Sequence, residues 1–126
     1  KKFFKYITHR KHGKNIIISG DFNICHQKID IHNPVANKNT SGFLLEEREW
    51  MDYLLEFGFI DSFRLKNTAP NNYSWWSYRA NSRLNNKGWR IDYHMVSENL
   101  VPRITDAQIL ADVAHSDHCP ISLCIS

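Results

Sequence analysis

Two stretches of the chain, residues 1–12 and 45–57, repeat apolar side chains at intervals of three or four positions, which is the period of a helix. Trp50, Leu54 and Phe57 form the apolar stripe of the second stretch. Glutamates gather at its start, where they suit the positive end of a helix, and a glycine follows it, as is common after a helix. We therefore predict one amphipathic helix in each stretch.

The other apolar runs are short and rich in β-branched or aromatic side chains. Residues 15–19 predict a buried strand that stops at Gly20. Further strands are predicted near residues 59–64, 73–79, 91–96, 104–110 and 119–125. Residues 22–42 lack periodicity and predict a long loop, a length that is usually functional or disordered. One strand, a helix and then several strands in succession are typical of an α+β fold.

The chain has 126 residues and no linker or repeat, so we expect one domain over residues 1–126. Its 42% hydrophobic and 23% charged residues exclude a wholly disordered chain. No apolar run approaches the roughly 20 residues of a membrane helix, and the start does not resemble a signal peptide. The odd number of cysteines argues against a secreted disulfide scaffold. We therefore expect an intracellular, cytoplasmic protein.

The net charge of +3 hides an uneven distribution. Residues 46–61 hold six acidic side chains, whereas residues 62–91 hold six basic ones, no acidic one, and several tryptophans and tyrosines. Basic side chains interleaved with aromatic ones suit a polyanion that carries bases or sugars. A solvated surface of strands and loops explains the same pattern equally well, so charge alone leaves nucleic-acid binding open.

The first chemical motif is Gly-Asp-Phe-Asn, residues 20–23, directly after the first predicted strand. If the extended backbone continues, Asp21 and Asn23 point the same way and Phe22 turns into the core. A carboxylate and a carboxamide side by side can hold and orient a water molecule or a metal-bound hydroxide. A turn in which the aspartate side chain bonds the backbone explains the pattern equally well.

Two further motifs lie near the ends of later predicted strands. Asp92 interrupts an apolar strand, and a buried carboxylate is costly without a partner, which indicates either a functional acid or a structural ion pair. Residues 115–119 read His-Ser-Asp-His-Cys, but no second cysteine or histidine cluster completes a zinc site. Asp117 and His118 suit phosphate chemistry better, as a carboxylate for a hard cation and an imidazole for a phosphoryl oxygen.

In this order and spacing, the motifs resemble the C-terminal half of exonuclease III-type apurinic/apyrimidinic endonucleases, in the endonuclease/exonuclease/phosphatase superfamily. The matching runs are GDFN (20–23), IDIHNP (29–34), SGFLLEER (41–48), YSWWSYRANSR (73–83), GWRIDYHMVSENL (88–100) and SDHCP (116–120). GDFN and SDH mark the whole superfamily, whereas WWSYR and GWRIDY indicate the abasic-site nucleases. The resemblance implies half of a four-layer α/β sandwich, with one mostly antiparallel sheet covered by helices.

The resemblance also implies a role for each candidate residue. Asp21 activates the attacking water, and Asn23 orients it or contacts the phosphate. Asp92 holds His118 in one tautomer and keeps it charged enough to bind the scissile phosphate. Asp117, together with Asp21, helps to ligate a divalent cation, Mg²⁺ or Mn²⁺.

Contacts with double-stranded DNA are implied as well. Trp75 and Trp89 wall a pocket for a flipped-out abasic sugar. Asn37 touches DNA or the site from the long loop, although a threonine stands where the family usually has a second asparagine three residues later. Arg79 and Arg83 belong to the basic, aromatic block, and we expect each of them to contribute about one phosphate contact.

Proteins of this family are about twice as long, and the resemblance implies that their N-terminal half supplies a metal-ligating glutamate, an asparagine and a tyrosine that no run here matches. We therefore expect a fragment whose parent cuts the phosphodiester 5′ to abasic sites and digests 3′ ends. Alone, it should be inactive and should self-associate through the apolar face that the missing half leaves uncovered. A phosphomonoesterase acting on inositol phosphates or lipids, and a non-catalytic DNA-binding fragment, remain open alternatives.

Overall fold

A computed structural model describes residues 2–11 and 14–126 of the chain. Its elements are α1 (Lys2–Lys11), β1 (Ile17–Asp21), η1 (Lys28–Asp30), α2 (Leu45–Glu56), β2 (Phe59–Asp61), α3 (Ser62–Lys66), β3 (Trp75–Trp76), β4 (Gly88–Trp89), β5 (Asp92–Ser97), η2 (Glu98–Arg103), β6 (Ile104–Ile109) and β7 (Ile121–Ile125). All strand pairs between them are antiparallel, which confirms the predicted α+β class. The strands form three small sheets, β1-β5-β2, β3-β4 and β6-β7, rather than one.

Strand β5 is the centre of the three-stranded sheet, with β1 on one side and β2 on the other. In the β1–β5 pair, Asp21 lies directly opposite Asp92. Tyr93 and Met95 turn to the other face from Asp92 and are almost fully buried, since side chains alternate along a strand. The register therefore sets two carboxylates side by side at the end of the sheet, outside its core.

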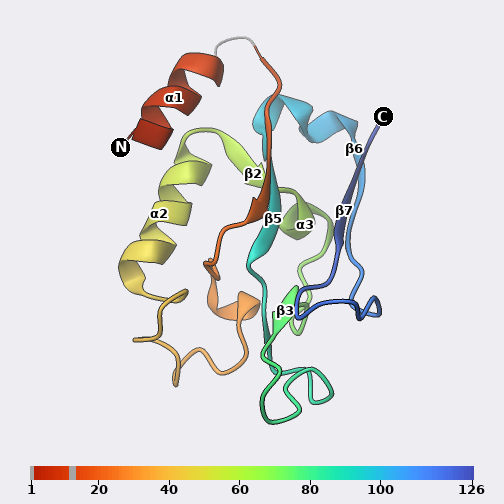
Figure 1. Ribbon diagram of the computed structural model, residues 1–126. Coiled ribbons are helices and arrows are strands. Elements are labelled where there is room, and N and C mark those ends of the chain that lie inside the picture. The colour runs from red at the N-terminus through yellow and green to blue at the C-terminus, as the bar shows by residue number, and fades with distance from the viewer. Residues whose placement is uncertain (1, 12–13) are drawn as a thin grey trace.

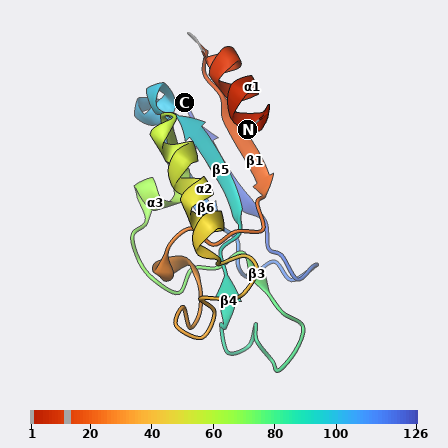
Figure 2. The ribbon, with the colours of Figure 1, turned by 90° about the vertical axis from the view of Figure 1, so that its left-hand side faces the viewer.

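Helices α1 and α2 cover one face of this sheet, and α3 with the β6–β7 hairpin lies on the other side (Figure 1). Figure 2 shows α2 in front of the strands. Met51 and Leu54 of α2 are fully buried in a core cluster that also contains Ile7 of α1. Both predicted helices are confirmed, although residues 1 and 12 lie outside the described part of the chain. No helix within that part is long and apolar enough to cross a membrane.

The prediction of a buried first strand is wrong. Strand β1 covers Ile17–Asp21 rather than residues 15–19, and most of its residues are exposed, with Ile17 44% accessible. Among the described residues, β1 pairs with β5 on one side only and is therefore an edge strand. A β-branched run indicates a strand, but the cover over its faces comes from elements elsewhere in the chain.

Two other predicted strands are shorter than expected. Within residues 59–64, β2 ends at Asp61. Asp61 is also the N-cap of α3, because its side chain accepts the backbone N–H of Arg64. Within residues 73–79, only β3 is a strand, and its partner β4 was not predicted. Strands β5, β6 and β7 confirm the predictions near residues 91–96, 104–110 and 119–125, with ends that agree within two residues.

The second face of the central sheet is not bare. Val96 of β5, Leu100 and Ile104 form a buried cluster there, against which Ile60 and Leu123 pack. The β6–β7 hairpin thus covers part of the surface that was expected to lie open. Self-association through this face stays a prediction.

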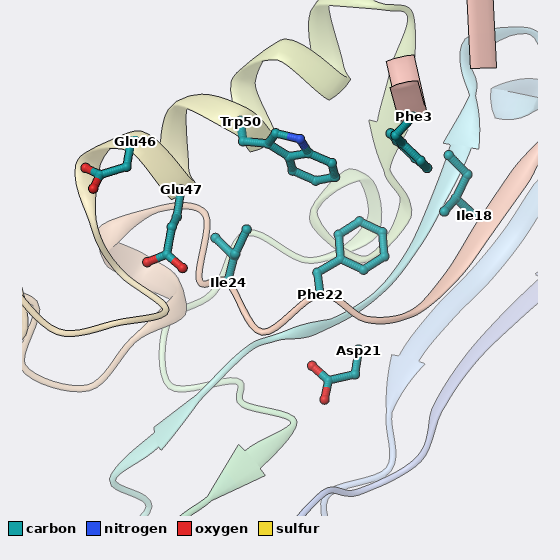
Figure 3. A pocket seen from close by; sticks show the side chains of 8 residues that line it. All are labelled: Phe3, Ile18, Asp21, Phe22, Ile24, Glu46, Glu47 and Trp50. Carbon is teal, nitrogen blue, oxygen red and sulfur yellow. The ribbon is translucent and has the colours of Figure 1, made fainter. Parts of the chain in front are cut away.

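An apolar groove of about 540 Å³ lies between α1, β1 and α2 (Figure 3). Its aromatic lining includes Phe3 and Phe22, whose ring centroids lie 5.6 Å and 6.2 Å from that of Trp50. Asp21 lies at the border of the groove, but Figure 3 shows Asp21 and Phe22 on opposite sides of the chain. The groove is therefore distinct from the place where the acidic side chains meet.

Candidate active site

A buried ion-pair network holds the segments that carry the site. The guanidinium of Arg90 is almost fully buried and donates to Asp30 of the long loop and to Asp61 at the end of β2. Arg64 donates to Asp30 as well. Burial opposes ionisation of Asp30, but Arg90 and then Arg64 outweigh it and hold the pKa of that carboxyl below its ordinary value. The network thereby fixes the start of β5 relative to the long loop.

Asp21 ends β1, and the chain turns immediately after it. Its Oδ1 accepts the backbone N–H of Asn23 at 2.8 Å, and Asn23 has a φ of +54°. Of the two alternatives that the sequence allowed, the structure has the turn in which the aspartate side chain bonds the backbone. The extended backbone does not continue through Asn23. Phe22 faces the core as expected, with its ring 5.3 Å from that of Tyr93. Because Oδ1 is engaged by the turn, Oδ2 is the oxygen that faces the site.

The structure brings Asp21, Asp92 and His118 together. Nδ1 of His118 lies 2.9 Å from Oδ2 of Asp92, and Nε2 lies 3.8 Å from Oδ2 of Asp21. The segment after residue 115 is joined to β3 by an isolated bridge between His118 and Trp75. Three side chains that come from three separate motifs therefore lie at one place in the fold. With Nδ1–H donated to Asp92, the ring presents Nε2 to whatever lies beside Asp21.

The electrostatics of this group favour a charged imidazole. Burial works against the charge on His118, but the hydrogen bond that its Nδ1–H donates to Asp92 and the charges of Asp92, Asp21 and Asp117 outweigh it and raise its pKa above the ordinary 6.5. More of the ring is therefore protonated near neutral pH than in a free histidine. A protonated ring can donate a hydrogen bond from Nε2 to a phosphate oxygen.

Replacing Asp92 with Asn should lower the pKa of His118 and make the stability loss depend on pH. A raised pKa in the folded chain adds stability below the unfolded value of 6.5, and that stability disappears as the pH rises through the folded pKa. The variant should therefore lose more stability at about pH 5 than at about pH 8. Urea unfolding at both pH values, with an NMR titration of His118, measures this. An equal loss at both would show that Asp92 does not support the charged ring.

A hollow of about 480 Å³ opens beside His118. It is lined by Asn23, Ser41, Trp75, Trp89, Ile91 and His118. The two indoles meet edge to face, with centroids 5.9 Å apart. A Cβ at Gly42 would lie 2.6 Å from the Trp89 ring, so only glycine lets the loop approach this indole so closely. The predicted tryptophan-walled pocket thus exists in shape, and Ser41 is a lining residue that the sequence did not single out.

Asp117 lies next to this group but is held differently. Its Oδ2 accepts the indole N–H of Trp75 at 3.0 Å, and Oδ1 accepts the hydroxyl of Ser116. The bond from Trp75 is the main reason why the pKa of Asp117 is below its ordinary value. Among the described residues, the group that could share one ion contains Asp21, Asp92 and His118 but not Asp117. The structure therefore gives Asp117 a contact with the wall of the hollow.

The remaining predicted DNA contacts lie further out. Asn37 donates its side-chain amide to the backbone carbonyls of His32 and Asn33, within its own loop. Arg79 is exposed. Arg83 instead donates to the carbonyls of Ser116, Ala111 and Val113, and its guanidinium lies 4.4 Å above the Trp76 ring. Arg83 thus holds the loop that leads to His118, a role that its position in a basic block did not indicate.

The carboxylates fit a divalent cation in part. Asp21, Asp92 and His118 can each offer one ligand atom, all within 4.8 Å of one another. Carboxylate oxygens are preferred by Mg²⁺ and Mn²⁺, and Oδ2 of Asp21 is the best placed of them. The imidazole of His118 is less suitable, because these cations prefer oxygen ligands and its raised pKa keeps a proton on Nε2 more often than in a free histidine. This chain can therefore supply a small part of an oxygen coordination shell.

Comparison with known proteins shows which family the chain resembles. A model described as "Endonuclease/Exonuclease/phosphatase family" matches residues 3–118. The exodeoxyribonuclease of Bacillus subtilis (strain 168) is 52% identical over 122 residues, which are 96% of this chain and 48% of that protein. The DNA repair nuclease APEX1 of Danio rerio is 45% identical over 111 residues, 87% of this chain and 36% of that protein. An AP endonuclease from Archaeoglobus fulgidus has a similar structure, with a TM-score of 0.90 at 25% identity over 98% of this chain and 50% of that protein. The chain spans about half or less of the length of these relatives.

Proposed function

The chain belongs to the endonuclease/exonuclease/phosphatase family, of whose domain it is a partial, C-terminal-like portion, and we propose that the complete domain is a DNA repair nuclease. It hydrolyses the phosphodiester 5′ to abasic sites and removes nucleotides from 3′ ends, inside the cell and with double-stranded DNA as partner. The observation that supports this proposal is the placement of Asp21 and His118 beside a hollow walled by two tryptophans.

In the proposed reaction, the oxygen of a water molecule bonds to the phosphorus and the bond between phosphorus and the 3′ oxygen breaks. The 3′ oxygen leaves with the electron pair and takes up a proton from solvent. Oδ2 of Asp21 accepts the proton that the water gives up, and the amide of Asn23 orients the water or the phosphate. His118 donates a hydrogen bond from Nε2 to a phosphate oxygen, and Asp92 holds Nδ1–H so that the ring keeps this orientation. A divalent cation, Mg²⁺ or Mn²⁺, would be held in part by the Asp21 carboxylate, with Asp92 within reach of the same ion, and would supply Lewis-acid stabilisation of the charge that develops on the phosphate.

The aromatic hollow favours DNA over the small phosphomonoesters that related enzymes use. Trp75 and Trp89 offer flat apolar faces that suit a sugar turned out of a duplex, and the phosphate beside that sugar would then lie near His118. A phosphomonoesterase needs neither feature.

A substrate comparison tests this proposal. We use a fusion protein, in which this chain follows the part of the Bacillus subtilis exodeoxyribonuclease that it does not cover. With Mg²⁺, the fusion protein should nick an abasic duplex and digest 3′ ends, and EDTA should abolish both activities. Phosphate release from inositol phosphates at a higher rate than nicking would favour the phosphomonoesterase. No activity on any of these substrates would favour a non-catalytic role.

The two arginines near the site should affect DNA binding differently. Arg79 is exposed, so replacing it with Ala should reduce the slope of log affinity against log salt by about one, as the loss of one phosphate contact does. Arg83 is bound to three backbone carbonyls, so Arg83→Ala should instead lower stability and leave the slope nearly unchanged. Binding of a plain duplex at several salt concentrations, with urea unfolding of both variants, measures this. Equal slopes in the two variants would contradict the assignment.

A further inference from the structure

We propose that Ser74 is a positioning residue, whose buried hydroxyl sets the distance between Asp92 and His118. This inference rests on the proposed function, because its consequence for catalysis requires those two side chains to act on a phosphate. Ser74 touches neither the hollow nor the groove of Figure 3. It has no accessible surface and lies directly before β3.

The hydroxyl of Ser74 bonds the start of β5. Its Oγ accepts the backbone N–H of Ile91 at 3.0 Å and that of Asp92 at 3.1 Å. These two N–H groups lie where the chain passes from β4 to β5. A buried N–H without a partner is unfavourable, and here a single oxygen satisfies both. The hydroxyl therefore does at this point what a neighbouring strand does elsewhere in a sheet.

The main chain of the same residue bonds the segment that carries His118. The carbonyl oxygen of Ser74 accepts the N–H of Cys119 at 2.8 Å, and its own N–H donates to the carbonyl of Trp89 at 3.0 Å. One residue thus joins β4, the start of β5 and the segment entering β7. Asp92 and Cys119 are therefore both bonded to Ser74, the first to its hydroxyl and the second to its carbonyl oxygen. Cys119 directly follows His118.

The contact between Nδ1 of His118 and Asp92 depends on this arrangement. The two residues come from segments 26 positions apart, and their side chains meet at 2.9 Å. If the hydroxyl is removed, the N–H of Asp92 must find another partner or move toward water, and the Asp92 carboxylate moves with it. A displacement of about 1 Å in a catalytic group can lower a rate by about 10²-fold.

A buried serine at the opposite end of β5 provides a matched control. Ser97 also has no accessible surface, and its Oγ accepts the N–H of Ile16 at 3.0 Å. Ser97→Ala removes the same kind of hydrogen bond from the same strand, far from His118. A loss of stability alone should affect both serine variants, whereas a change in the Asp92–His118 pair should affect only Ser74.

The test uses the fusion protein with Ser74→Ala, Ser74→Thr and Ser97→Ala. The first readout is the proton NMR signal of the Nδ1–H of His118, which a hydrogen bond to a carboxylate shifts downfield. The second readout is kcat and KM for nicking of an abasic duplex. We expect Ser74→Ala to lose the downfield signal and to lower kcat between about tenfold and about 10²-fold with little change in KM. Ser74→Thr, which keeps the hydroxyl, and Ser97→Ala should each retain the signal and most of kcat.

Three results would overturn the inference. The first is an unchanged signal and kcat in Ser74→Ala, and the second is an equal effect of Ser97→Ala. The third is failure of Ser74→Thr alongside Ser74→Ala, since the side chain would then matter for its size and not for its hydroxyl. If the unmodified fusion protein does not cut DNA, the proposed function fails, and the NMR signal alone then decides the role of Ser74.

Discussion

Replacing Asp21 with Asn in the fusion protein is expected to lower kcat for nicking of an abasic duplex by about 10²–10⁴-fold. Oδ2 of Asp21 is the carboxylate oxygen that faces Nε2 of His118, and an amide in its place cannot accept the proton of the attacking water. The substitution keeps the size of the side chain, and Oδ1 can still accept the N–H of Asn23. The turn after β1 should therefore survive, and the loss should appear in kcat and not in folding.

Two companion variants make the Asp21 result specific. Glu49→Gln removes an exposed carboxylate from α2 and should leave kcat within about twofold of the unmodified protein, because surface changes away from a site have small effects. Asp117→Asn tests the neighbouring acid, which is bonded to Trp75. If Asp117→Asn lowers kcat more than Asp21→Asn does, the proton acceptor is Asp117, and the role proposed for Asp21 is wrong.

The helices could be predicted from the sequence because their signals are local. The apolar stripe of α2 lies within residues 45–57, and the glycine after it has the positive φ that ends many helices. The exposure of β1 could not be predicted in this way. β1 pairs with β5, which lies far along the chain, and nothing in a run of isoleucines shows whether a strand has neighbours on one side or on both. Helix α3 was hidden for a related reason, because five residues with one N-cap also read as the end of a strand.

The candidate site likewise has features that local patterns predict and features that depend on contacts between distant segments. Its acids and His118 could be expected to converge because their motifs lie near the ends of predicted strands. The contacts of Ser74, Arg83 and Asp117 could not, because each joins segments that no short pattern relates. Arg83 and Arg79 stand in the same basic block, and only the folded loop shows that one is bound to carbonyls while the other is exposed. A weak signal was present for Ser74, a small polar residue inside an aromatic run.

The 126-residue chain alone is expected to cut an abasic duplex at least about 10³-fold more slowly than the fusion protein, in Mg²⁺. The described residues bring two carboxylates and one imidazole within reach of a single ion, and the imidazole is a poor ligand for Mg²⁺ because its raised pKa favours a proton on Nε2. Mg²⁺ requires six ligands in an octahedral arrangement, and a weakly held ion is absent from most molecules at moderate concentrations. Loss of about 4 kcal/mol of transition-state stabilisation, within the range that a bound metal supplies, corresponds to about 10³-fold in rate.

Nicking assays on both proteins at equal concentration, over a range of Mg²⁺ concentrations, measure this difference. If the chain alone lacks metal ligands, its small activity should continue to rise with Mg²⁺ where that of the fusion protein has levelled off. Sedimentation in the same buffer shows whether the chain forms dimers, and dimer formation should not restore the rate, because a second copy brings the same two carboxylates and no new ligand type. Nicking by the isolated chain at the rate of the fusion protein would mean that the carboxylates of Asp21 and Asp92 are sufficient to hold the cation.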